Sequence, residues 1–281
     1  MFRMEHKENF IPNRLGQISN YKTLMGKTIS IANQKGGVGK TTTAINVAAS
    51  LAAAEKHILL IDTDPQGNST SGMGIARENL NGSLYNIYNG TKNIEEVIQN
   101  TELNHLKIIP SNIDLIGAEL ELIAKEGRET ILKRAIEPVK SRFDFIFIDC
   151  PPSLSLLTLN ALVAADSLLI PMQCEYYALE GISSLIKTLE LVRGSFNSYL
   201  DIEGILLTMF DGRNTLANQV AAELKNHFGD KVYKTMIPRN VTLAEAPSHG
   251  KPVILYDIHS KGAQSYLELA KEMMENENGT G

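Results

Sequence analysis

The chain has 281 residues, of which 43% are apolar, so it can bury a sizeable core as one large domain or two small ones. Its formal net charge of -5 excludes a protein that is basic throughout, and any contact with nucleic acid must come from a local patch. No apolar run is long enough to span a bilayer, and the two cysteines lack a zinc-site spacing, which fits a reducing, cytosolic compartment.

Short apolar runs alternate with helical patterns along most of the chain. Strands are expected at 28–33, 57–62, 106–111, 143–149, 167–172, 202–210 and 232–238. Helices are expected at 41–54, at 114–139 in one or two pieces, and at 179–194, 214–229 and 261–275. Because the strands are continuously apolar, the pattern predicts an α/β fold: a doubly wound, mostly parallel sheet with helices on both faces.

This pattern favours one domain at 27–275 between two flexible tails, at 1–26 and 276–281. Residues 1–27 hold five lysines and arginines against two glutamates, a balance of +3, and they lack the apolar stretch of a signal peptide.

The segment NQKGGVGKTTT (33–43) lies between the first expected strand and the first expected helix, the context that a phosphate-binding loop requires. The backbone N–H groups of residues 36–42 can point inward around a triphosphate, at the N-terminus of a helix. Gly36, Gly37 and Gly39 allow positive φ angles and a close approach of the ligand. The alternative is an ordinary glycine-rich turn.

The polar residues of this loop have distinct expected roles. Lys40 is expected to reach the β- and γ-phosphates, Thr41 to bind Mg²⁺ and Thr42 to bind an α-phosphate oxygen. The usual pattern has glycine at position 34, where this chain has Gln34, and a second lysine, Lys35, precedes the glycines.

Two further expected strands end in carboxylates. Asp62 and Asp64, in IDTDPQGN, can orient a water or help to hold the metal shell, and their spacing does not rank them. Asp149, in FIFIDCPPSLS, has the Walker B arrangement, in which the carboxylate binds Mg²⁺ directly or through water. The alternative for each is a solvated turn at a strand end. Cys150 has no histidine nearby in sequence and is expected to be a small core residue.

A fourth stretch, MIPRNVTLAEAPSHG (236–250), follows the last expected strand. Pro238 and Asn240 are candidates for contact with a nucleotide base, and Arg239 for contact with phosphate or a partner, although a plain surface loop is the alternative. All four stretches lie beyond the carboxyl ends of expected strands, where ligands of such sheets bind. Their coincidence is stronger evidence than any single motif.

These stretches together resemble one protein family. KGGVGKTTTAINVAASLA is similar to the deviant Walker A box of the ParA/MinD ATPases, in which a lysine precedes the glycines and the first glycine is absent. IDTDPQGNSTSG, IDCPPSLSLLTLNALVAADSLLIPMQCEYYALEGI and IPRNVTLAEAPSHGKPVILYD are similar to the Soj-like branch of chromosome-partitioning ParA proteins. The resemblance extends from about residue 27 to about residue 272.

The resemblance implies an ATP- and Mg²⁺-dependent ATPase that forms an ATP-sandwich homodimer in the cytoplasm, on the nucleoid. The dimer would bind double-stranded DNA without sequence preference and respond to DNA and a ParB-like, centromere-binding partner. By resemblance, Lys35 crosses to the nucleotide of the other subunit, Asp64 is needed for hydrolysis, Asp149 is the Walker B acid, and Arg213 contributes to DNA binding. The family often has a basic residue where this chain has Thr242, which weakens the case for DNA or partner contact there.

The expected site residues form four sets. The catalytic set is Lys35, Lys40 and Asp64, and the metal set is Thr41 and Asp149. The nucleotide-binding set is Lys35, Gly36, Gly37, Val38, Gly39, Lys40, Thr41, Thr42, Pro238 and Asn240. The DNA-binding set is Arg213 with the weaker candidates Lys225, Lys231, Lys234 and Lys251, although on charge alone a solvated mixed surface is the better explanation.

Three other functions fit the sequence less well. A MinD-like ATPase acting on a membrane needs a basic amphipathic C-terminal helix, whereas KEMMENENGTG is acidic. An iron–sulfur reductase needs cysteines at a two-fold axis, whereas Cys150 follows the Walker B acid and Cys174 ends a strand. A non-catalytic nucleotide-binding scaffold does not need the intact Thr41, Asp64 and Asp149.

Overall fold

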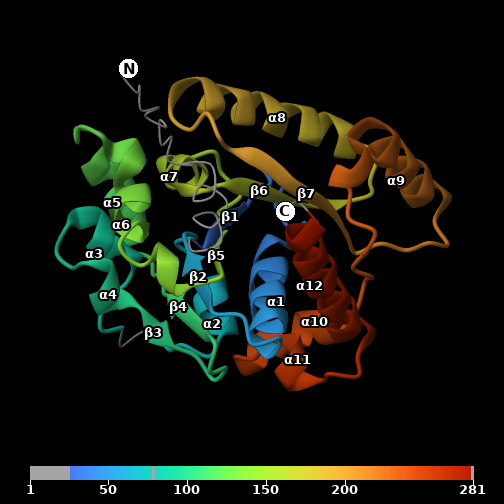
Figure 1. Ribbon diagram of the computed structural model, residues 1–281, viewed down its shortest axis with the longest axis horizontal. Coiled ribbons are helices and arrows are strands. Elements are labelled where there is room, and N and C mark those ends of the chain that lie inside the picture. The colour runs from blue at the N-terminus through green and yellow to red at the C-terminus, as the bar shows by residue number, and fades with distance from the viewer. Residues whose placement is uncertain (1–25, 78–79, 280–281) are drawn as a thin grey trace, which may run out of the picture.

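The computed structural model describes residues 26–77 and 80–279. Its seven strands form one sheet in the order β3-β4-β2-β5-β1-β6-β7 (Figure 1). They are β1 (Lys27–Ile31), β2 (Ile58–Asp62), β3 (Gln99–Asn100), β4 (Leu106–Ile109), β5 (Phe145–Asp149), β6 (Ser167–Gln173) and β7 (Asp201–Thr208). All neighbouring strands are parallel except the short β3, which is antiparallel to β4. The prediction of a doubly wound, mostly parallel sheet is therefore confirmed.

Helices cover both faces of this sheet (Figure 1). One face carries α1 (Lys40–Ala53), α2 (Asn68–Gly72), α10 (Val241–Glu245), α11 (Val253–Tyr256) and α12 (Lys261–Gly279). The other carries α3 (Leu84–Asn89), α4 (Ile94–Val97), α5 (Leu115–Leu122), α6 (Ile131–Ile136), α7 (Leu156–Ala164), α8 (Ala178–Ser195) and α9 (Thr215–Phe228). Short 3₁₀ helices are η2 (Arg128–Thr130), η3 (Lys140–Arg142), η4 (Gly229–Lys231) and η5 (Ala246–His249).

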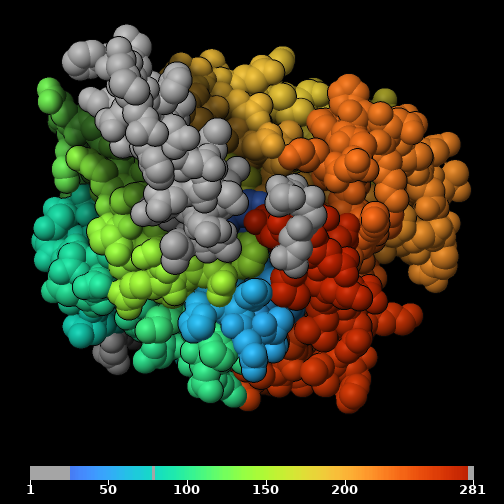
Figure 2. Space-filling view, viewed as in Figure 1, coloured from blue at the N-terminus to red at the C-terminus, as the bar shows by residue number. Residues whose placement is uncertain are grey.

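The strands are apolar throughout because each of their two faces is buried under helices. Successive residues of β5 show this, since Phe147 belongs to the core under α1 and Ile148 to the core under α7 and α8. In the space-filling view, blue residues from the first quarter of the chain lie beside the red residues of α12 (Figure 2). A hydrogen bond of 3.1 Å between the Thr43 and Tyr266 hydroxyls joins α1 to α12.

The expected strand at 232–238 is wrong. This segment makes only two isolated bridges, from Val232 to Ile205 in β7 and from Pro238 to Phe210 just after β7. Between them, the N–H groups of Lys234 and Thr235 donate to the carboxylate of Glu272 on α12, at 2.8 and 2.9 Å. The Glu272 carboxylate therefore replaces the neighbouring strand as the hydrogen-bond partner of residues 234 and 235 only, and a continuous ladder cannot form between the two bridges.

Other differences concern boundaries and short helices. The helical region expected at 114–139 is divided, because Gly127 has a left-handed φ of 65° between α5 and α6. The buried helix α7 was not expected from the sequence. Helix α12 extends to Gly279, so residues 276–279 are helical rather than part of a tail. The tail expected at 1–26 lies, apart from Gly26, outside the described residues, as do 280–281.

Candidate nucleotide-binding site

The loop between β1 and α1 has the conformation that its glycines permit. Gly37 and Gly39 have φ angles of 72° and 85°, which residues with a side chain rarely adopt. Gly36, which could also adopt a positive φ angle, does not. A Cβ atom added at Gly36 or Gly37 would meet no atom within 4 Å, so the loop is open on that side. The loop therefore has room for a ligand in contact with its backbone.

Two hydrogen bonds from side chains hold the backbone of this loop. The Thr208 hydroxyl, at the end of β7, donates to the carbonyl of the buried Val38 at 2.8 Å. The ammonium of Lys40 donates to the carbonyl of Lys35 at 3.1 Å, so this side chain spans the loop. Burial lowers the pKa of Lys40, and the negative charges of Asp149 and Asp64 oppose this effect. Lys40 is thus a partly desolvated cation at the base of the loop.

Asp149, at the end of β5, lies beside the start of α1. It is fully buried, and its Oδ2 accepts from the Ser69 hydroxyl at 2.8 Å, whereas its Oδ1 has no hydrogen-bond partner among the described residues. Burial raises the pKa of Asp149, while the hydroxyls of Ser69 and Thr41 lower it. A buried carboxylate oxygen without a donor, with the Thr41 hydroxyl nearby, is an oxygen donor set that suits Mg²⁺.

The structure distinguishes the two aspartates that follow β2. Asp62 is fully buried and accepts from the N–H and hydroxyl of Thr70, at 2.8 and 2.7 Å, and from the N–H of Asp64 at 3.1 Å. Burial and the neighbouring Asp149 raise its pKa. Asp64 is half-buried, and its Oδ1 accepts from the Gln66 N–H at 2.9 Å. Asp62 therefore holds the turn together, while a carboxylate oxygen of Asp64 is available to a ligand.

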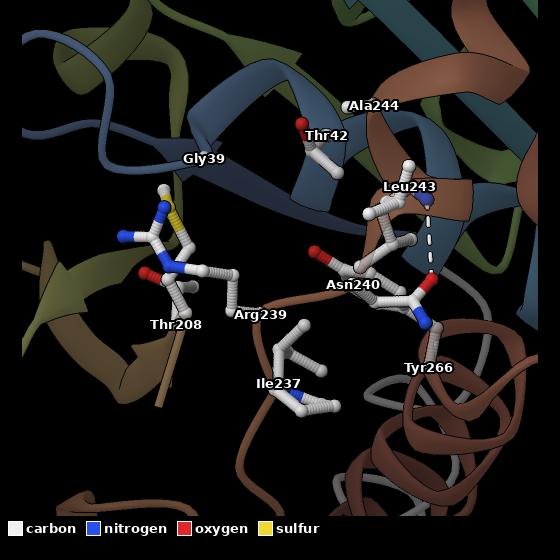
Figure 3. A pocket seen from close by; sticks show the side chains of 12 residues that line it. Gly39, Thr42, Thr208, Ile237, Arg239, Asn240, Leu243, Ala244 and Tyr266 are labelled. Atoms are coloured by element: carbon white, nitrogen blue, oxygen red, sulfur yellow. Dashed lines mark hydrogen bonds between the residues drawn. The ribbon is translucent and has the colours of Figure 1, made fainter. Parts of the chain in front are cut away.

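A pocket of about 360 Å³ opens beside the N-terminus of α1 (Figure 3). The expected residues Pro238 and Asn240 line it together with Gly39 and Thr42, which brings distant motifs to one place. Asn240 also begins α10, and its Oδ1 accepts from the Leu243 N–H at 3.3 Å. The other lining residues are Thr208, Met209, Ile237, Arg239, Val241, Leu243, Ala244 and Tyr266. The apolar walls and few polar groups are typical of a small-molecule site.

Several of these lining residues were not expected. Met209 has a left-handed φ of 48°, and Tyr266 reaches the pocket from α12. Neither belongs to a local motif, because one depends on a single backbone conformation and the other on the packing of α12 against α1. The positions after β7 could have been found only by the general rule that ligands bind at strand ends.

Lys35 does not point into the loop. Its side chain is 45% exposed, and its ammonium forms an ion pair with the carboxylate of Glu175, between β6 and α8. The two lysines of the motif therefore have different environments, since Lys40 is buried and Lys35 faces solvent.

The five candidate DNA-binding residues do not form one patch on the chain. Arg213 follows the carboxyl end of β7, whereas Lys231 pairs with Asp201 at its amino end, at 2.9 Å. Lys251 lies 3.8 Å from Glu102, which precedes β4 near the other edge of the sheet. The two remaining candidates, Lys225 on α9 and Lys234 after β7, are exposed.

The sheet, the loop at the start of α1 and the acid at the end of β5 are those of a P-loop NTPase with a deviant Walker A motif. The sequence model of a family described as an AAA domain matches residues 26–202. The chain is 56% identical over 252 residues to the sporulation initiation inhibitor protein Soj of Bacillus subtilis, covering 90% of this chain and all of that one. It is 54% identical over 253 residues to the chromosome partitioning protein ParA of Myxococcus xanthus, covering 90% of this chain and 89% of that one. The chain therefore belongs to the ParA/Soj family of chromosome-partitioning ATPases.

A solved structure with the same fold is cobyrinic acid a,c-diamide synthase from Mycobacterium smegmatis, with a bound ATP analogue and magnesium. It is 34% identical, has a TM-score of 0.79, and the match covers 91% of this chain and 97% of that one. Within the described part of the present chain, no helix is both long enough and apolar enough to cross a membrane.

Proposed function

We propose that this protein hydrolyses ATP in a Mg²⁺-dependent reaction as a nucleotide-bridged homodimer, and that the dimer binds double-stranded DNA without sequence preference in the cytoplasm, on the nucleoid. A ParB-like, centromere-binding protein and DNA are proposed to stimulate the reaction. The observation that carries the proposal is that three features meet at the carboxyl ends of the strands: the open loop, the buried Asp149 and the pocket lined by Thr42.

The nucleotide is proposed to lie with its base in the pocket and its phosphates along the loop. The backbone N–H groups at the start of α1 bind the phosphate oxygens, and Lys40 exchanges the Lys35 carbonyl for the β- and γ-phosphates. Thr41 and Asp149 would hold Mg²⁺, which when bound neutralises charge on the phosphate oxygens. Asp64 would orient the attacking water. Positioning and electrostatic stabilisation account for most of the catalysis in this class of reaction.

Lys35 is proposed to act on the nucleotide of the facing subunit. Its exposed side chain extends away from its own loop, which supports a role outside its own phosphate site. An additional cation is most useful where charge develops on the transferred and leaving oxygens. Supplying that cation from a second subunit would make hydrolysis depend on dimerisation.

DNA is favoured over a membrane as the surface on which the dimer acts. Leu269, Ala270 and Met273 of α12 are buried in the core beneath α1, so the apolar side of this helix is not available to lipid.

The two cysteines do not favour an iron–sulfur reductase. Cys150 and Cys174 are both buried, and burial raises the pKa of both thiols, as for core residues rather than cluster ligands.

Turnover of ATP by the purified protein tests the proposal. Hydrolysis is expected to require Mg²⁺, to stop when EDTA is added, and to increase when duplex DNA and the cognate ParB-like protein are both present. Lys40→Ala should lose nucleotide binding. Nucleotide binding without turnover under all these conditions would instead indicate a non-catalytic scaffold.

The trans role of Lys35 has its own test. Lys35→Ala is expected to bind ATP as a monomer and to fail in both dimerisation, measured by analytical ultracentrifugation, and hydrolysis. A mixture with Asp64→Ala should recover turnover wherever mixed dimers form, because one of their two sites then contains both groups. A Lys35→Ala protein that dimerises and hydrolyses ATP normally would exclude this role.

A further inference from the structure

The first residues of the phosphate-binding loop are hydrogen-bonded to β6 and α8. The Asn33 side chain donates to the carbonyl of Pro171 in β6 at 2.8 Å. Gln34 accepts from the Ser184 hydroxyl at 3.2 Å and donates to the Thr188 hydroxyl at 3.5 Å, both on α8. Gln34 therefore replaces a conformationally free glycine with a side chain that fixes the loop against a long helix.

Further hydrogen bonds fix the position of the Lys35 backbone. Its N–H donates to the Asn33 Oδ1 at 3.0 Å, and its carbonyl accepts from Lys40 at 3.1 Å. With the backbone held on both sides, the ammonium reaches Glu175, the one acidic group within ion-pair distance of it among the described residues. Glu175 is itself held in a turn, because its N–H donates to the Gln173 carbonyl at 2.9 Å.

This ion pair is formed within one subunit. A lysine that binds the nucleotide of a facing subunit must first leave its own carboxylate. Glu175 is 54% exposed, so water and salt screen the pair and it can break readily. A triphosphate carries more negative charge than a carboxylate and can replace it as the partner of the ammonium.

We infer that Glu175 is a positioning residue for Lys35, which it holds on its own subunit until the nucleotide of a facing subunit replaces it. The inference rests on the proposed trans role of Lys35. Glu175 would thereby oppose dimerisation, because its ion pair must break before Lys35 reaches the facing nucleotide, and would leave nucleotide binding by the single subunit unaffected.

The test compares dimerisation of Glu175→Gln with that of the unmodified protein, by analytical ultracentrifugation over a range of protein concentrations with Mg²⁺ and a non-hydrolysable ATP analogue. Because an exposed ion pair is worth little, Glu175→Gln is expected to dimerise at a concentration lower by a factor of roughly two to five. Glu175→Asp keeps the charge on a shorter side chain and should lie between the two. Glu180→Gln, which removes an exposed charge from the first turn of α8, is the control and should change nothing.

Two measurements separate positioning from a general effect on folding. The difference between Glu175→Gln and the unmodified protein should shrink as salt is raised, because screening weakens the pair. Acetylation of Lys35 by acetic anhydride, followed by mass spectrometry without nucleotide, should be roughly two to five times faster in Glu175→Gln, with Lys56 as the internal reference.

The outcomes distinguish this inference from the proposed function. If Lys35→Ala fails to dimerise while Glu175→Gln dimerises no more readily than the unmodified protein, or its Lys35 is acetylated no faster, the role of Glu175 is overturned and that of Lys35 stands. If Lys35→Ala dimerises and hydrolyses ATP normally, both are overturned.

Discussion

At the scale of single residues, the end of β2 shows how two identical side chains acquire different roles. Asp62 accepts three hydrogen bonds in the core, whereas Asp64 is half-buried at the mouth of the loop. The sequence predicts that both lie at a strand end but cannot rank them, because accessibility depends on how Ser69 and Thr70 of α2 fold over the strand.

Asp62→Ala is expected to reduce the stability of the fold. The substitution leaves the N–H and hydroxyl of Thr70 and the N–H of Asp64 without their acceptor, and unsatisfied buried donors are costly. The free energy of unfolding, measured by urea titration, should fall by about 2–4 kcal/mol. A loss below about 0.5 kcal/mol, the size of an ordinary surface effect, would contradict this role.

Asp64→Ala, unlike Asp62→Ala, is expected to reduce turnover and to leave the stability of the fold nearly unchanged. The phosphate loop and Thr41 remain, so the variant should bind ATP and unfold at nearly the same urea concentration as the unmodified protein. Its turnover should fall by a factor on the order of 10² or more, because a group that positions the water is lost. It should therefore accumulate as a dimer in ATP. Near-normal turnover by the purified variant would rule out the proposed role.

At the scale of elements, segment 232–238 shows why one expected strand is absent. Its apolar residues occupy the core, since Val232, Tyr233 and Ile237 are buried, but Glu272 takes up the N–H groups of Lys234 and Thr235. The sequence predicts which residues are buried here, but not that a helix 38 positions away would provide the hydrogen-bond acceptor.

Glu272→Gln tests the function of this contact. The segment leads directly to Pro238 and Asn240 in the pocket, so loosening it should weaken nucleotide binding more than the chemical step. A charge-assisted hydrogen bond is worth about 1.5–3 kcal/mol, and losing part of this should raise the KM for ATP several-fold with little change in kcat. Glu268→Gln, an exposed position one turn earlier on α12, is the control. An unchanged KM would show that the segment holds its conformation without Glu272.

The sequence predicts the residues that would bind phosphate and metal better than it predicts the residues that line the pocket. The loop, Thr41 and Asp149 are local motifs, and the structure brings them together because parallel strands end at one edge. Met209 and Tyr266 depend on a backbone conformation and on helix packing that no local pattern specifies. The same limit explains the missed helix α7, which is apolar nearly all round and so lacks the periodicity that marks a half-exposed helix.

At the scale of the whole molecule, the distribution of charge constrains how an acidic protein can bind DNA. With a net charge of -5, attraction to phosphate must be local. Lys231 and Lys251 each pair with an acid of the chain, near opposite edges of the sheet. Arg213 differs because its side chain is 91% exposed and its only partner among the described residues, Asp211, lies two positions away in the same turn. The guanidinium holds the pKa of Asp211 at about 2, so Asp211 remains ionised at neutral pH.

Arg213→Ala is therefore expected to weaken DNA binding more than any of the four lysine substitutions. A guanidinium in an exposed turn can exchange Asp211 for a backbone phosphate, and dimer symmetry would supply two such contacts. Each neutralised phosphate contributes roughly 0.9 to the slope of log affinity against log salt, so the slope should fall by about 1.8. Fluorescence anisotropy with two unrelated duplexes, across a salt titration with ATP and Mg²⁺, measures this directly. Lys231→Ala is the matched control, because its charge is engaged by Asp201 at the other end of β7, and nucleotide binding should be unchanged in both variants. An unaltered slope in Arg213→Ala would place the DNA surface elsewhere, and a preference for one duplex would exclude non-specific binding.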